Sequence, residues 1–117
     1  MPATHSPEGR ISTALRNFGC SELAFVKLCK SLAVQISSGG INEALAGKRT
    51  FDQQTVEQLF GVLAKMNALQ NSIGTIPVDW SRTELISTAI KCEELSNVAG
   101  GKDFAELADR ATKAVTQ

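Results

Sequence analysis

INEALAGKRTFDQQTVEQLFGVLAKM, residues 41–66, is the stretch that decides the fold expected of this chain. It predicts a short helix with an apolar face, a Gly-Lys-Arg turn and a longer amphipathic helix that Asp52 or Thr50 caps. The apolar residues of the longer helix recur at helical spacing, namely Val56, Leu59, Phe60, Leu63 and Met66. This layout is typical of a helix-turn-helix module.

Two helices are expected upstream of this stretch. Residues 1–5 read as a disordered lead, after which Ser6-Pro7-Glu8 carries the signals of a helix start, and this first helix runs to about Phe18. Gly19 is a natural stop. Ser21 can cap a second helix that ends near Val34, with Lys27 and Lys30 facing outward. Residues 35–40, QISSGG, then form a breaker, and the third helix spans 41–46 and ends at Gly47.

Two more helices are expected downstream. Residues 71–79 carry a break, because Gly74 and Pro77 oppose helical continuation. Asp79 or Ser81 starts a fifth helix, and Gly100-Gly101 separates it from a sixth. The sixth helix places these residues on one side: Phe104, Leu107, Ala108, Ala111 and Val115. Trp80 is expected to be a core plug, with an anchor at a protein interface as the alternative.

Length and composition favour one all-α domain. The chain has 117 residues, 43% of them hydrophobic and only 5% aromatic, which suits helices packed by aliphatic side chains. The predicted fold is a compact bundle of five or six helices. The expected organisation is a flexible N-terminal lead over 1–9, a helix-turn-helix core over 10–72, and C-terminal helices over 73–117 that pack on the core or form a dimer interface.

Charge is balanced overall but unevenly distributed. The formal net charge is zero, so the whole molecule has no general attraction for polyanions. Residues 10–50 hold six cations and two anions, a net of +4, whereas residues 51–117 hold six cations and nine anions, a net of −3. The basic part coincides with the predicted helix-turn-helix. It is equally consistent with lysines and arginines that solvate helix faces.

The sequence carries no pattern typical of an enzyme, metal site or membrane protein. Cys20, Cys29 and Cys92 are far apart and form no CxxC pair, and Cys29 and Cys92 fit small core positions. The catalytic motifs of hydrolases, kinases and metalloproteases are missing, so we expect no catalytic residues, metal or cofactor. No apolar run is long enough to span a bilayer and no signal-peptide pattern is present. A cytoplasmic protein without a membrane partner is the expectation.

Residues 10–69 resemble the DNA-binding domain shared by phage Cro and CI repressors and the wider XRE-like regulators. The matching pieces are LCKSLAV at 28–34, like the family's second helix, INEALAGKR at 41–49, like the end of its recognition helix and the turn after it, and FDQQTVEQLFGVLAKM at 51–66, like its fourth helix. The resemblance implies a lambda-repressor-like core whose third helix enters the major groove.

Carried over position by position, the resemblance implies a DNA-binding surface. Residues facing bases would be Ser37, Ser38, Gly39, Gly40 and Asn42, and residues facing phosphates would be Lys48, Arg49 and Thr50. Ile41 and Leu45 would point into the core. The chain departs from the family pattern in two places. Gln35-Ile36 lengthens the connection before the third helix, and Gly39-Gly40 replaces long polar side chains with what we expect to be a loose or adapted turn.

Two functions from different classes are favoured at this stage, and a structural or assembly adaptor without a charge-driven partner is the weaker third alternative. The first is a small DNA-binding transcriptional regulator, such as a repressor of phage or mobile-element origin, that binds double-stranded DNA, with a homodimer as a further expectation. The second is a helix-turn-helix-derived module that binds a protein partner, such as an inhibitor of a nucleic-acid enzyme. The basic turn favours the first. Neutral charge, the glycine pair and Glu43, which would repel phosphate if it faced the groove, favour the second.

Overall fold

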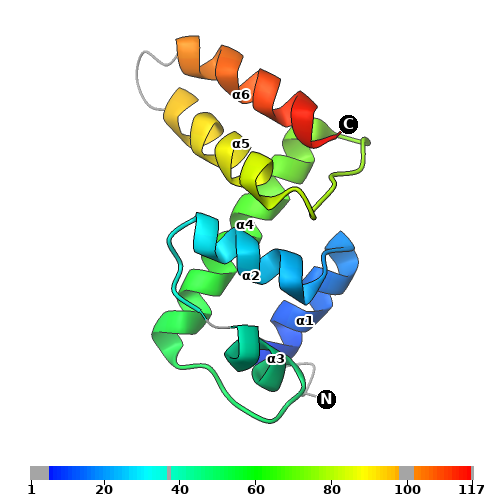
Figure 1. The fold of residues 1–117 in the computed structure, drawn as a ribbon, viewed down its shortest axis with the longest axis vertical. Coiled ribbons are helices and arrows are strands. Elements are labelled where there is room, and N and C mark those ends of the chain that lie inside the picture. The colour runs from blue at the N-terminus through cyan, green and yellow to red at the C-terminus, as the bar shows by residue number, and fades with distance from the viewer. Residues whose placement is uncertain (1–5, 37, 98–101, 117) are drawn as a thin grey trace.

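The computed structural model describes residues 6–36, 38–97 and 102–116, and these residues are all-helical. They form six α-helices: α1 (Pro7–Phe18), α2 (Glu22–Ser31), α3 (Ser38–Leu45), α4 (Gln53–Ile73), α5 (Thr83–Ser96) and α6 (Lys102–Val115). Figure 1 shows α4 as the long central helix, with α1, α2 and α3 around its first half and the α5–α6 pair at the other end. The predicted all-α class is confirmed, and the number of helices lies within the predicted range.

Three helices begin where the capping residues in the sequence predicted a helix start. Ser6 accepts from the Gly9 amide at 3.1 Å, Ser21 from the Ala24 amide at 3.1 Å, and Asp52 from the Thr55 amide at 2.7 Å. Each bond satisfies one of the amides that the first turn of a helix leaves without an intrahelical partner. Because α1 begins at Pro7, residues 7–9 belong to a helix and not to the flexible lead expected over 1–9.

The end of α2 differs from the expectation. The helix stops at Ser31, three residues before the predicted Val34, because Ala33 adopts a left-handed conformation with φ of 63°. The Ala33 amide then donates to the Lys30 carbonyl at 3.1 Å and the Val34 amide to the Cys29 carbonyl at 2.8 Å. This is the bonding pattern of a Schellman motif, in which glycine usually occupies the left-handed position. Alanine gave no signal of the ending.

Three other boundaries also differ. The third helix starts at Ser38 and not at Ile41, so Gly39 and Gly40 lie in its first turn instead of in a loose turn. Helix α4 continues through the predicted break at 71–73 and ends where Gly74 follows. Helix α5 begins at Thr83, so neither Asp79 nor Ser81 caps it. Ser37 and Gly100-Gly101 lie outside the described residues.

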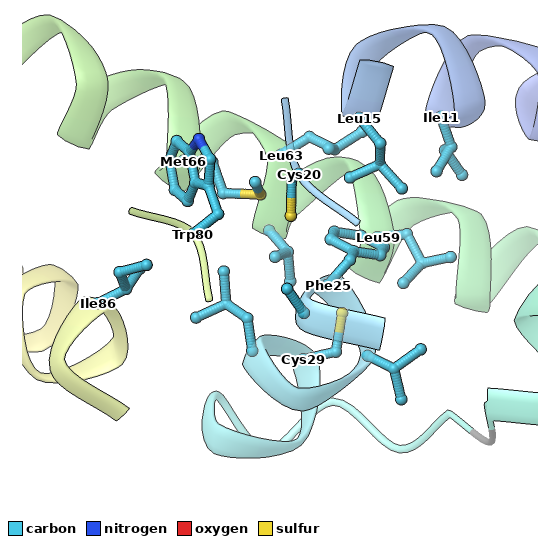
Figure 2. Close-up of a cluster of buried hydrophobic side chains, with 14 of the residues drawn as sticks. Ile11, Leu15, Cys20, Phe25, Cys29, Leu59, Leu63, Met66, Trp80 and Ile86 are labelled. Atoms are coloured by element: carbon cyan, nitrogen blue, oxygen red, sulfur yellow. The ribbon is translucent and has the colours of Figure 1, made fainter. Parts of the chain in front are cut away.

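One apolar core joins the helices. Figure 2 shows part of this cluster, with Phe25 entering from α2, Leu59 and Met66 from α4, and Trp80 from the segment before α5. Trp80 is 5% exposed and meets Phe18 edge-on at 5.4 Å between ring centroids. This burial confirms the expected core plug. The aliphatic stripe of α4 is confirmed too, because Leu59, Leu63 and Met66 are all buried.

Helix α6 packs against α5, and α5 in turn packs against α2 and α4. The Asp79 amide donates to the Val115 carbonyl at 3.2 Å, which ties the α4–α5 connection to the end of α6. Lys91 of α5 donates to the Ser31 carbonyl of α2 at 3.1 Å. The pair leaves three large apolar side chains exposed, namely Leu95, Phe104 and Leu107. Phe104 and Leu107 belong to the predicted apolar side of α6, so that side is only partly covered.

Candidate nucleic-acid interface

Helix α3 is held to the bundle by one buried face. Ile41 and Ala44 are fully buried and Leu45 is 6% exposed, while Asn42 and Glu43 between them are exposed. The expectation that Ile41 and Leu45 point into the core is confirmed. Because α3 has only eight residues and packs on α1 and α2, this burial rather than intrinsic helix propensity must stabilise it.

The α3–α4 turn, residues 46–52, follows a tight helix ending. Gly47 has φ of 82°, a conformation that glycine adopts without steric cost. The Gly47 amide donates to the Ala44 carbonyl at 3.1 Å and the Lys48 amide to the Glu43 carbonyl at 2.8 Å. This ending leaves Lys48, Arg49 and Thr50 exposed at the surface.

One of the two turn cations is already paired. Arg49 Nη1 lies 3.7 Å from Glu43 Oε2, and about 60% of each side chain is exposed. An exposed pair of this kind is weak and exchanges readily with another anion. Glu43 therefore offsets part of the charge of Arg49 and would compete with any other anion for its guanidinium. Lys48 takes part in none of the ion pairs found among the described residues.

A buried carboxylate anchors the α3–α4 turn to α1. Glu8 is 5% exposed, and its Oε1 accepts a hydrogen bond from the Phe51 amide at 2.8 Å. The Arg10 guanidinium lies over the Phe60 ring, 5.0 Å from its centroid, and links α1 to α4. The sequence indicated only an acid in the first turn of a helix at Glu8. Its partner is 43 residues away, and no local pattern predicts a contact of that range.

Five of the eight residues predicted to bind DNA fall into two groups in the structure. Gly40, Arg49 and Thr50 line one hollow of about 300 Å³ between the α2–α3 connection and the start of α4. Asn42 and Lys48 are exposed but are not among its lining residues. Asp52 also lines this hollow, and hydrogen bonds from Thr55 hold the pKa of its carboxyl below the usual value. The hollow thus contains a fixed negative charge beside Arg49.

The three cysteines occupy buried or half-buried positions. Cys20 and Cys29 are buried and Cys92 is half-buried, and all three are free thiols. Burial raises the pKa of Cys20 to about 11 and that of Cys29 to about 12, so both stay protonated near neutral pH. The described ranges contain no cluster of three or more histidine, cysteine or acidic side chains suited to a metal ion.

Comparison with protein-family models, with curated proteins and with solved structures found no match to this chain. In the described part of the chain, every helix is too short or too polar to cross a bilayer.

Proposed function

We propose that this protein is a small DNA-binding transcriptional regulator that contacts double-stranded DNA with α3 and the α3–α4 turn. The observation that carries the proposal is the exposed Lys48-Arg49 pair, which directly follows a short helix anchored on one face only. Cations beside the phosphate backbone gain affinity by releasing condensed counterions, and a helix next to them can then reach base edges.

The exposed positions of α3 limit how sequence can be read. Asn42 can pair with adenine through its amide, whereas Gly39 and Gly40 offer no side-chain contact. We therefore expect few direct base contacts per copy and a large share of affinity from phosphate contacts. A second copy would double the number of base contacts, and repressors with this kind of motif bind paired half-sites in that way.

The partly covered surface of α5 and α6 suits such a second copy. Leu95 of α5 and Phe104 and Leu107 of α6 are between 42% and 48% exposed, and the two helices pack against each other. On α6, Asp103 and Glu106 precede Leu107, and Arg110 and Lys113 follow it, with Lys113 paired to Asp109 of the same helix at 3.0 Å. Two antiparallel α6 helices related by a twofold axis would bring opposite charges together.

A direct binding experiment tests the DNA proposal. Fluorescence anisotropy with a mixed-sequence duplex at low salt should show binding, and Lys48→Ala with Arg49→Ala should weaken it roughly tenfold across sequences. Lys65→Ala is the matched control, because Lys65 lies on α4 and pairs with Glu94 at 3.3 Å. Equal affinity of the double variant and the native protein would contradict the proposed contact.

The Glu43–Arg49 pair supplies a second arm of the same experiment. Glu43→Gln removes a negative charge and frees Arg49, so it should strengthen duplex binding about two- to fivefold. The pair also favours the second candidate function, a module that binds a protein, because an interface with alternating charges can accommodate both groups. In that case Glu43→Gln would weaken binding to the protein partner and would not create affinity for DNA.

A further inference from the structure

A groove between α2 and the start of α5 is lined by positively charged side chains, and it is separate from the α3–α4 turn. The α2–α5 groove has a volume of about 550 Å³ and is lined by Lys27, Lys30, Ser31, Ser81, Arg82, Thr83, Glu84 and Leu85. Lys27 and Lys30 are exposed and belong to none of the ion pairs among the described residues. Arg82 adds a third positive charge and is held in place by its hydrogen bond to the Ala114 carbonyl.

The first turn of α5 faces this groove without a side-chain cap. Ser6, Ser21 and Asp52 cap α1, α2 and α4, but Arg82 stands at the cap position of α5 and makes no capping hydrogen bond. The nearby Asp79 carboxylate accepts from the amide and the hydroxyl of Ser81 instead. The amides of the first turn are consequently available to an acceptor from outside, and the helix dipole favours an anion there.

Thr83 provides a second, independent observation that points to a ligand at this groove. The residue is only 7% exposed and lines the groove, yet its hydroxyl makes none of the hydrogen bonds found among the described residues. No fully buried side-chain oxygen or nitrogen in those residues lacks a partner. The Thr83 oxygen must therefore keep some accessible area, and the residue itself lines the groove. A buried residue with an unpartnered hydroxyl is a natural donor to a bound oxyanion.

We propose that the α2–α5 groove binds a phosphate group. The ammonium groups of Lys27 and Lys30 supply charge, and the α5 amides and the Thr83 hydroxyl supply directed hydrogen bonds. Glu84 also lines the groove and offsets one of the positive charges. The volume exceeds what a lone phosphate needs, so the group can belong either to a small phosphorylated molecule or to a nucleic-acid backbone. The proposal does not depend on DNA binding at the α3–α4 turn.

Titration with inorganic phosphate, followed by amide NMR at constant ionic strength, tests this site. The amides of Thr83, Glu84 and Leu85 should shift saturably, and Lys27→Gln with Lys30→Gln should abolish the shifts. Thr83→Val, which preserves the shape of the side chain, should weaken phosphate binding about tenfold. Lys48→Gln with Arg49→Gln is the matched control and should leave these shifts unchanged.

The same spectra, recorded with a mixed-sequence duplex, identify the source of the phosphate. If the duplex shifts the α5 amides and competes with inorganic phosphate, the groove receives a nucleic-acid backbone. If phosphate shifts the α5 amides but the duplex shifts only residues of the α3–α4 turn or none, the groove receives a small phosphorylated molecule. Shifts that fail to saturate, or that persist in the Lys27→Gln and Lys30→Gln variant, would overturn the proposal.

Discussion

The α3–α4 turn and the α2–α5 groove both present exposed cations, but they are built in different ways. Lys48 and Arg49 are neighbours in sequence, and a glycine ending places them on the turn. In the groove, Lys27 and Lys30 of α2 meet the first turn of α5, which lies far along the chain. The turn holds an internal ion pair, whereas the groove holds two lysines outside any observed pair. The number of cations alone therefore does not decide which of the two surfaces binds an anion more strongly.

The largest effect expected from this comparison concerns the anchor of the α3–α4 turn. Glu8→Ala removes the acceptor of the Phe51 amide and leaves that amide without its 2.8 Å partner. We expect the free energy of unfolding to fall by about 2 kcal/mol. Urea denaturation measures this change.

Glu8→Gln is the matched control for this anchor, because it keeps an oxygen acceptor at the same position. It should lose much less stability than Glu8→Ala. An equal loss in both variants would mean that charge at Glu8, and not the hydrogen bond to Phe51, stabilises the turn.

The cap of α4 should show a smaller and pH-dependent effect. Asp52→Ala removes the acceptor of the Thr55 amide and should lower the melting temperature at neutral pH by roughly 3–6 °C. Hydrogen bonds from Thr55 lower the folded-state pKa of Asp52, so its contribution is present above the unfolded pKa and is lost as pH falls through the folded one. Thermal denaturation from neutral to acidic pH should show the difference between native protein and variant shrinking in acid.

A substitution in the connection between α2 and α3 should stabilise the protein. Ala33 ends α2 with φ of 63°, which costs a residue with a Cβ atom more than it costs glycine. Ala33→Gly should therefore raise the free energy of unfolding by roughly 0.5–1 kcal/mol, measured by urea denaturation. Ala46→Gly is a control expected to give no gain, because Ala46 is exposed just after α3 and its φ is not positive. A loss of stability in Ala33→Gly would contradict the strain inferred at this position.

The smallest effect is expected in the α2–α5 groove. The Thr83 hydroxyl has no partner among the described residues, so Thr83→Val should change the free energy of unfolding by less than about 0.5 kcal/mol. The contrast with Glu8→Ala separates a polar group that stabilises the fold from one that is available to a ligand. A loss as large as that of Glu8→Ala, in the same urea assay, would place Thr83 with the structural groups.

Local signals in the sequence predicted much of the fold. Ser6, Ser21 and Asp52 were recognisable caps, and Gly19 and Gly47 were recognisable stops, because each acts on residues within one turn. The apolar stripe of α4 and the burial of Trp80 also followed from local pattern. The start of α3 was predicted three residues too late, because Gly39 and Gly40 favour a break in a helix. In the structure, burial of Ile41 and Ala44 stabilises the helix that contains these glycines.

The rest depends on contacts between distant residues. Alanine at position 33 carries no sequence signal of a left-handed ending, and nothing near Glu8 points to Phe51. The expected caps of α5 were wrong because Asp79 bonds to Ser81 instead. The predicted start at Asp79 or Ser81 also gave no indication that Thr83, the first residue of α5, lines the α2–α5 groove. On the α3–α4 turn, the sequence predicted which residues are exposed but not that Arg49 pairs with Glu43.

The salt dependence of duplex binding tests the central claim most directly. If the α3–α4 turn contacts phosphates, the logarithm of the association constant should fall linearly with the logarithm of salt concentration. Lys48→Ala with Arg49→Ala should then reduce the steepness of that line by about two. Absence of binding to a mixed-sequence duplex at low salt, or an unchanged slope in the double variant, would contradict the account.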